Sequence, residues 1–136
     1  MMKRILAAVV LGAAVLTAAC SDPIAPTTPT PVVPVTAEVF NDTLLVQGAN
    51  THSFTVTDIG GLRVSLTSLQ PGAAVGLGVG TYGLGSCTII DHISAVAGAS
   101  IQLSGTVTVP GTYCVEVYDL GNLVESVAYT INVLHS

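Results

Sequence analysis

The chain's three cysteines and three histidines are the side chains best suited to covalent, acid–base or metal chemistry. They are Cys20, Cys87, Cys114, His52, His92 and His135. The histidines are too far apart along the sequence to be identified as zinc ligands, which usually include residues only a few positions apart. We therefore predict no metal centre from them, and we expect the histidines to lie on the surface or in loops.

Two short motifs resemble parts of enzyme sites but lack the surroundings that those sites need. In Asp91-His92 a carboxylate could orient an imidazole, but neighbouring side chains of an extended strand point to opposite faces. The stretch GVGTYG, residues 78–83, matches G-x-G-x-x-G, yet a dinucleotide site needs a following helix within a βαβ unit. The sequence contains no G-x-S-x-G motif of a serine hydrolase. It therefore predicts neither an enzyme nor a bound cofactor.

Three acidic residues, Glu116, Asp119 and Glu125, bracket one predicted turn. Carboxylates gathered near a loop can bind calcium, so these residues are the candidates for a calcium site. The same pattern is equally typical of a solvated strand face and of an aspartate that caps its own turn. Both interpretations remain open at this point.

The charge distribution excludes nucleic acid as a partner. The 136 residues include eight acidic and three basic side chains, Lys3, Arg4 and Arg63, which gives a formal net charge of −5. Binding to a phosphate backbone requires several cationic contacts, and this chain cannot supply them. Half of the residues are hydrophobic and only 8% are charged, a composition typical of a folded chain.

The N-terminus has the features of a secretory signal. Lys3 and Arg4 precede an apolar run, residues 5–19, that is shorter than the ~20 residues of a membrane-spanning helix. Residues 16–20, LTAAC, resemble the lipobox of bacterial lipoproteins. The resemblance implies that residues 1–19 are removed and that Cys20 is acylated, which would anchor the protein to a membrane. The alternative is a plain secretory signal in which Cys20 is incidental.

Residues 20–36 are predicted to form a tether. They contain five prolines, at positions 23, 26, 29, 31 and 34. Proline fixes φ and lacks a backbone donor, so this stretch favours an extended polyproline II conformation. Ser21 after the cysteine resembles the outer-membrane sorting signal of Gram-negative lipoproteins. We expect an exported protein that is lipid-anchored to the cell envelope, at the outer membrane if the source is Gram-negative.

Residues 37–136 carry the pattern of an all-β domain. Apolar and hydroxyl-bearing residues alternate in short runs, as in LRVSLTSL at residues 62–69, and Gly, Pro, Asn or Asp separates the runs. About eight mostly antiparallel strands are expected, with no helix, which predicts a single β-sandwich. We expect a break in the first strand at Asn41 and Asp42. We also expect a hairpin at residues 119–122, with Gly121 in a left-handed conformation, that pairs residues 111–119 with residues 124–134.

Cys87 and Cys114 remain as a pair inside the predicted domain. Cysteines in an exported protein usually form disulfides, so we predict a bond between them. Two free buried thiols are the alternative.

Residues 61–80, Cys87 and residues 110–133 together resemble the bacterial pre-peptidase C-terminal (PPC-like) domain. The match spans residues 51–135, and its most distinctive part is PGTYC at residues 110–114. The resemblance implies a jelly-roll-like sandwich that is not catalytic and that supports secretion, spacing or attachment to polymers such as collagen or polysaccharide. The chain departs from collagen-binding relatives because it has no Trp and few acidic residues near the start of the domain.

These observations predict a noncatalytic envelope lipoprotein whose sandwich is a binding or structural module for a protein or polysaccharide. The alternative is an accessory module that supports the secretion or polymer attachment of a separately encoded hydrolase. Tyr82 and Tyr118 are the candidate binding residues, because exposed aromatic side chains often mark partner sites.

Overall fold

The computed structural model describes residues 28–30, 32–98 and 100–136. The predicted signal peptide, Cys20 and the first part of the predicted tether lie outside the described residues. The described residues that precede Thr36 are exposed and form neither helix nor strand. No helix capable of spanning a bilayer occurs in the part of the chain that the structure describes.

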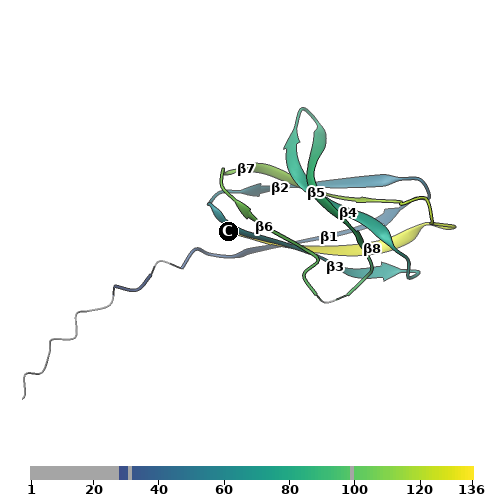
Figure 1. Cartoon of the computed structure of the whole chain (residues 1–136), viewed down its shortest axis with the longest axis horizontal. Helices are drawn as coiled ribbons and strands as arrows, with labels where there is room; N and C mark the ends of the chain where they lie inside the picture. The colour runs from purple at the N-terminus through teal and green to yellow at the C-terminus, as the bar shows by residue number, and fades with distance from the viewer. Residues whose placement is uncertain (1–27, 31, 99) are drawn as a thin grey trace, which may run out of the picture. The chain divides into compact units, whose positions relative to one another are not determined.

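The unit that begins at Pro31 is an all-β sandwich, as predicted (Figure 1). Its eight strands are β1 (Thr36–Leu44), β2 (Ala49–Val56), β3 (Gly60–Gln70), β4 (Val75–Gly83), β5 (Ser86–Ala95), β6 (Leu103–Val107), β7 (Gly111–Tyr118) and β8 (Val127–His135). One sheet has the order β1-β8-β3-β6 and the other β2-β7-β4-β5, with all neighbours antiparallel. Each sheet interleaves early and late strands, the arrangement of an eight-stranded jelly roll.

The core lies between the two sheets and consists of the inward side chain of every second residue. In β8, Val127, Ile131 and Val133 are buried, whereas the intervening residues Thr130 and Asn132 are only partly covered. This alternation follows from the pleat of a strand, which directs successive side chains to opposite faces. The alternating apolar runs of the sequence therefore became the inner faces of the sandwich.

The predicted hairpin between β7 and β8 is wrong. β7 pairs with β2 and β4, and β8 pairs with β1 and β3, so residues 119–126 cross from one sheet to the other. Gly121 does adopt a positive φ of 89°. Asp119 accepts hydrogen bonds from the backbone N–H groups of Gly121, Asn122 and Leu123, and Leu123 is buried against the core. The chain turns tightly here, but the turn leads into the opposite sheet.

The expected break in the first strand is also absent. β1 continues through Asn41 and Asp42, whose partners in β8 are Thr130 and Tyr129. The side chain of Thr130 donates a hydrogen bond of 2.7 Å to Asn41. Strand pairing with β8 therefore overrides the low strand propensity of Asn and Asp.

The β4–β5 hairpin bends away from its sheet. The register between the two strands shifts between Val79 and Gly80 because β5 has an extra residue, Ile90, at this point. A Cβ atom on Gly80 would overlap the backbone carbonyl of Thr88. The bend therefore requires glycine at position 80. β4 still pairs with β7 through Thr81, and beyond that residue the hairpin projects from the sandwich on the side of β2 and β7 (Figure 1).

The close approach at Gly80 can be tested by adding a single methyl group. Gly80→Ala should lower the free energy of unfolding of the sandwich unit by about 1–3 kcal/mol, because the backbone of Thr88 must move. Gly61→Ala is the matched control, since Gly61 is also in a strand but a Cβ there meets no atom within 4 Å. The control should be neutral or stabilising by about 0.5–1 kcal/mol in urea unfolding. Equal stability of the two variants would contradict the assigned bend.

Candidate functional site

The tip of the β4–β5 hairpin carries a leucine that nothing covers. Leu84 has a relative exposure of 109%, and it occupies a two-residue turn between the paired residues Gly83 and Ser86. Both turn residues have positive φ, 53° at Leu84 and 78° at Gly85. Type I′ hairpin turns favour Asn or Gly at such positions, and bulky residues are rare in this conformation. A leucine at position 84 is therefore unfavourable in two ways. Its backbone has a positive φ, and its apolar side chain is fully exposed to water.

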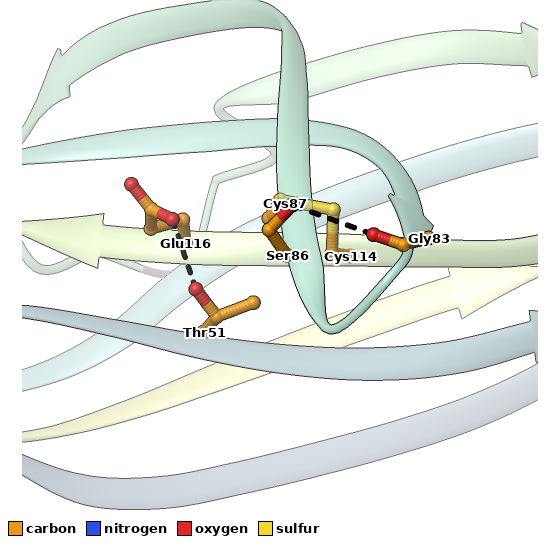
Figure 2. Close-up of a disulfide and its surroundings, with 6 residues drawn as sticks. All are labelled: Thr51, Gly83, Ser86, Cys87, Cys114 and Glu116. Carbon is orange, nitrogen blue, oxygen red and sulfur yellow. Dashed lines mark hydrogen bonds between the residues drawn. A yellow bond between two sulfur atoms is a disulfide. The ribbon is translucent and has the colours of Figure 1, made fainter.

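The disulfide predicted from the sequence forms and holds this hairpin against the sheet. Cys87 of β5 is bonded to Cys114 of β7, with an S–S distance of 2.09 Å and a Cα–Cα distance of 5.8 Å. Figure 2 shows the hairpin crossing over β7 at this bond, beside the hydrogen bond of 2.9 Å that Thr51 donates to Glu116. A cross-link closing a loop of this length contributes about 3–4 kcal/mol in the chain-entropy model. The disulfide therefore ties the hairpin to β7 close to its tip, because Cys87 is only one residue pair from the Gly83–Ser86 pair beside the turn.

The glycine-rich stretch of β4 forms part of a strand surface and not a phosphate-binding loop. Gly76 and Gly78 lie on the outer face of the sheet, where Cβ atoms would meet the ring of Tyr118 and the side chain of Ile89. No helix follows this strand, since β4 leads directly into β5. Because Gly76 and Gly78 have no side chains, the side chains of Tyr118 and Ile89 can lie close against the strand.

The two tyrosines proposed as binding residues lie on this same sheet. Tyr82 is half-buried in the hairpin, opposite Cys87 in the β4–β5 register. Tyr118 is also half-buried, and its ring lies against Gly76. Tyr82 is thus part of the projecting hairpin, whereas Tyr118 packs on the body of the sheet.

A narrow apolar slot lies beside the base of the hairpin. It has a volume of about 130 Å³ and opens between β3 and β6 of one sheet and β4 and β5 of the other. Its apolar lining includes the following side chains: Leu62, Val64, Val79, Ile90, Leu103 and Val107.

The slot exists because position 105 lacks a side chain. Gly105 pairs with the buried Leu62 and alternates with the buried Leu103 and Val107, so a side chain there would point inward. A Cβ atom at this position meets nothing within 4 Å. The slot was not predicted, although the glycine at an inward position of the run LSGTV, residues 103–107, is its signal in the sequence.

The candidate calcium ligands each have a different place in the fold. Glu116 accepts a hydrogen bond from Thr51 on the outer face of the sheet, and Glu125 is exposed in the β7–β8 connection. Asp119 accepts hydrogen bonds from the backbone N–H groups of that connection and of Gln47, and these bonds lower the pKa of its carboxyl group. Among the described residues, no three His, Cys, Asp or Glu side chains come close enough to hold a metal ion.

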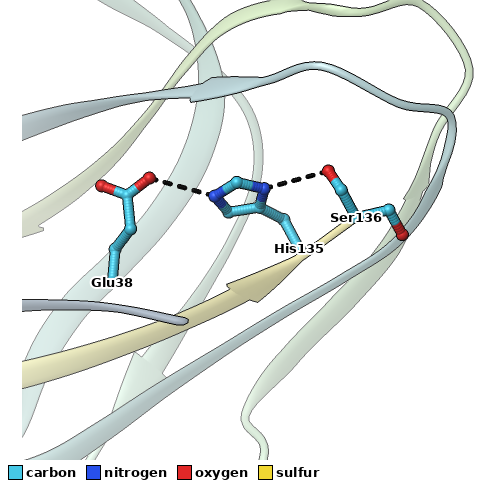
Figure 3. Close-up of polar contacts among 3 residues, drawn as sticks. All are labelled: Glu38, His135 and Ser136. Atoms are coloured by element: carbon cyan, nitrogen blue, oxygen red, sulfur yellow. Dashed lines mark hydrogen bonds and ion pairs between the residues drawn. The ribbon is translucent and has the colours of Figure 1, made fainter. Parts of the chain in front are cut away.

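The expectation of surface histidines is correct only for His92, which is exposed on β5. His135 is 3% exposed, and its ring nitrogens lie 3.0 Å from Glu38 Oε1 and 3.1 Å from the Ser136 carbonyl oxygen (Figure 3). His52 is partly buried and lies 2.7 Å from the hydroxyl group of Tyr129. The expectation failed because both strands place these positions on the inner face.

Aromatic rings surround the two inner histidines. Phe40 stacks on His52 with ring centroids 4.8 Å apart, and Phe54 stacks on His135 at 5.4 Å. Burial lowers the pKa of His52, with an opposing effect from Asp42, and burial raises the pKa of Tyr129 to about 12. The hydroxyl group of Tyr129 therefore stays protonated at neutral pH and can donate to the neutral imidazole. The two inner histidines, His52 and His135, thus have structural partners.

No protein-family model matches this chain, and no curated protein matches it either. The assignment of the site therefore rests on the geometry described above.

The inner position of His52 predicts a pH-dependent stability. Because the pKa of His52 is lowered, its ring binds a proton less readily in the folded protein than in the unfolded chain. The free energy of unfolding should therefore fall as the pH drops from about 7 to about 5. His52→Gln should reduce this dependence in thermal unfolding followed by circular dichroism. His92→Gln, at an exposed position, should retain the wild-type dependence. An unchanged pH dependence in His52→Gln would contradict the argument.

Proposed function

We propose that this protein is a noncatalytic envelope lipoprotein whose sandwich presents the β4–β5 hairpin to an apolar pocket of a protein partner. The proposal rests on the full exposure of Leu84, which lies at the turn of a hairpin that a disulfide ties to β7 close to this turn. A rigid apolar tip loses little conformational entropy on binding, so most of the energy of its burial appears as affinity. Apolar side chains that enter pockets are typical anchors of protein interfaces.

Export is supported by two separate features. The Cys87–Cys114 disulfide is typical of proteins from oxidising compartments outside the cytosol. The N-terminal segment has the order of a secretory signal and ends in the lipobox-like residues 16–20. A lipid on Cys20, followed by the proline-rich tether, would hold the sandwich clear of the membrane.

The noncatalytic role is supported by the partners of the titratable side chains. Glu38 faces His135, Glu116 accepts from Thr51, and Asp119 caps the β7–β8 connection. An active site would gather such groups around a shared cavity, but the slot beside the hairpin is mainly apolar and includes one ionisable carboxylate, Asp91. This surface suits recognition by shape and apolar contact better than acid–base chemistry.

Lipid attachment can be tested with a labelled fatty acid in cells that express the full chain. The wild-type protein should incorporate the label, and Cys20→Ala should lose it, because the acyl chain is attached to that thiol. Cys87→Ser is the matched control and should keep the label, since Cys87 belongs to the disulfide. Equal labelling of wild type and Cys20→Ala would refute the anchor.

The role of the hairpin can be tested with a photo-crosslinking amino acid at position 84 of the full chain in living cells. It should give discrete adducts after irradiation, because an anchor residue lies in contact with its partner. The same amino acid at Ile59, an apolar residue of the β2–β3 connection with 63% exposure, is the control and should give fewer. Equal yields from the two positions would reject the hairpin as the recognition element.

A further inference from the structure

The chain carries both a projecting apolar side chain and an apolar slot that no side chain fills. Leu84 is the most exposed large hydrophobic residue of the described sandwich, and the slot beside β6 is lined mainly by aliphatic side chains. Both features lie on the β4–β5 hairpin or at its base, where Val79, Gly80 and Ile90 border the slot. One copy of the chain therefore has both an exposed apolar side chain and an apolar slot, and Leu84 is not among the residues that line the slot.

The slot has the right size for a leucine side chain. A cavity of ~150 Å³ lined by aliphatic and aromatic side chains binds benzene, which has six carbon atoms. The slot measures about 130 Å³, and the isobutyl group of leucine has four carbons. Gly105 leaves the entrance open on the β6 side, since nothing lies within 4 Å of the position of its absent Cβ.

The charges around Leu84 and around the slot would also permit a contact between two copies of the chain. The hairpin residues 81–88, TYGLGSCT, contain no ionisable acidic or basic side chain apart from Tyr82 and the disulfide-bonded Cys87. Asp91 is the charged residue that borders the slot. A chain with a formal net charge of −5 repels a second copy of itself, so a contact between copies is best made by an uncharged segment.

We propose that the slot binds Leu84 from the hairpin of a second copy of this chain. The exchange would remove the side chain of Leu84 from water and would cover the apolar lining of the slot, which is open to solvent in a single copy. If two copies exchange leucines reciprocally, the contact closes as a symmetric dimer.

This inference rests on the proposed function, because it identifies the partner of the same hairpin. A contact based on one leucine in each copy is small, but two copies anchored to one membrane by Cys20 would meet at a high effective concentration. Burial of one leucine should strengthen the association by about tenfold to a hundredfold.

The test uses two full-length copies with different tags, expressed together in the same cells. The first copy has the photo-crosslinking amino acid at position 84, and the second copy is wild type or has a substitution near the slot. Irradiation should give an adduct that contains both tags, and mass spectrometry should locate the cross-link in the second copy near β6 (Leu103–Val107).

Gly105→Val in the second copy should abolish this adduct, because the new side chain fills the slot. Gly61→Val is the matched control and should leave the adduct unchanged. Gly61 pairs with Thr106 on the outer face of the same two strands, and a Cβ there is also free of contacts. Thermal unfolding of both variants should confirm that the sandwich remains folded.

Three outcomes would overturn the inference. An adduct that persists with Gly105→Val shows that the slot is not the binding site. Adducts with other proteins alone show a different partner and leave the proposed function standing. The absence of any adduct above the Ile59 control overturns the inference and also the assignment of the hairpin as recognition element, whereas the lipid-labelling test of Cys20 is unaffected.

Discussion

The sandwich is held together by aliphatic side chains that both sheets direct into one shared core. Val64, Leu66, Val115 and Ile131 come from three strands in two sheets, and each has no exposed surface. A chain with three basic residues can form few salt bridges, so burial of apolar surface must supply most of its stability. The places of the hairpin, the slot and the inner histidines depend on which side chains each strand directs into this core and which it directs to the surface.

Three positions without side chains shape the candidate site. Gly80 allows the backbone of Thr88 to approach, which bends the hairpin, and Gly76 gives the ring of Tyr118 a place on the sheet. Gly105 leaves the slot between the sheets. A side chain at Gly80 or Gly105 would remove the bend or fill the slot. The bend of the hairpin and the neighbouring slot therefore depend on glycines, which have no Cβ atom.

At the edge formed by β1 and β2, polar side chains replace part of the aliphatic core. His52 lies beside Tyr129, and His135 lies beside Glu38, so each inner imidazole has a hydrogen-bonding partner. Buried polar groups are tolerated when they are paired in this way. The inward carboxylate of Glu38 on the edge strand β1 also opposes pairing with a further strand from another chain.

The amino-acid pattern was enough to predict the all-β class, the inner residues of β3 and β8, the positive φ of Gly121 and the preferred pairing of Cys87 with Cys114. These features depend on alternation over two residues, on turn chemistry or on the number of cysteines, all of which are local or compositional. The tertiary structure was needed to place β7 and β8 in different sheets, to turn two histidines inward and to form an apolar slot where the β4–β5 hairpin leaves the sheet. The physical reason is that a strand's pattern specifies which face it buries, whereas its partners are chosen by contacts between residues distant in the chain.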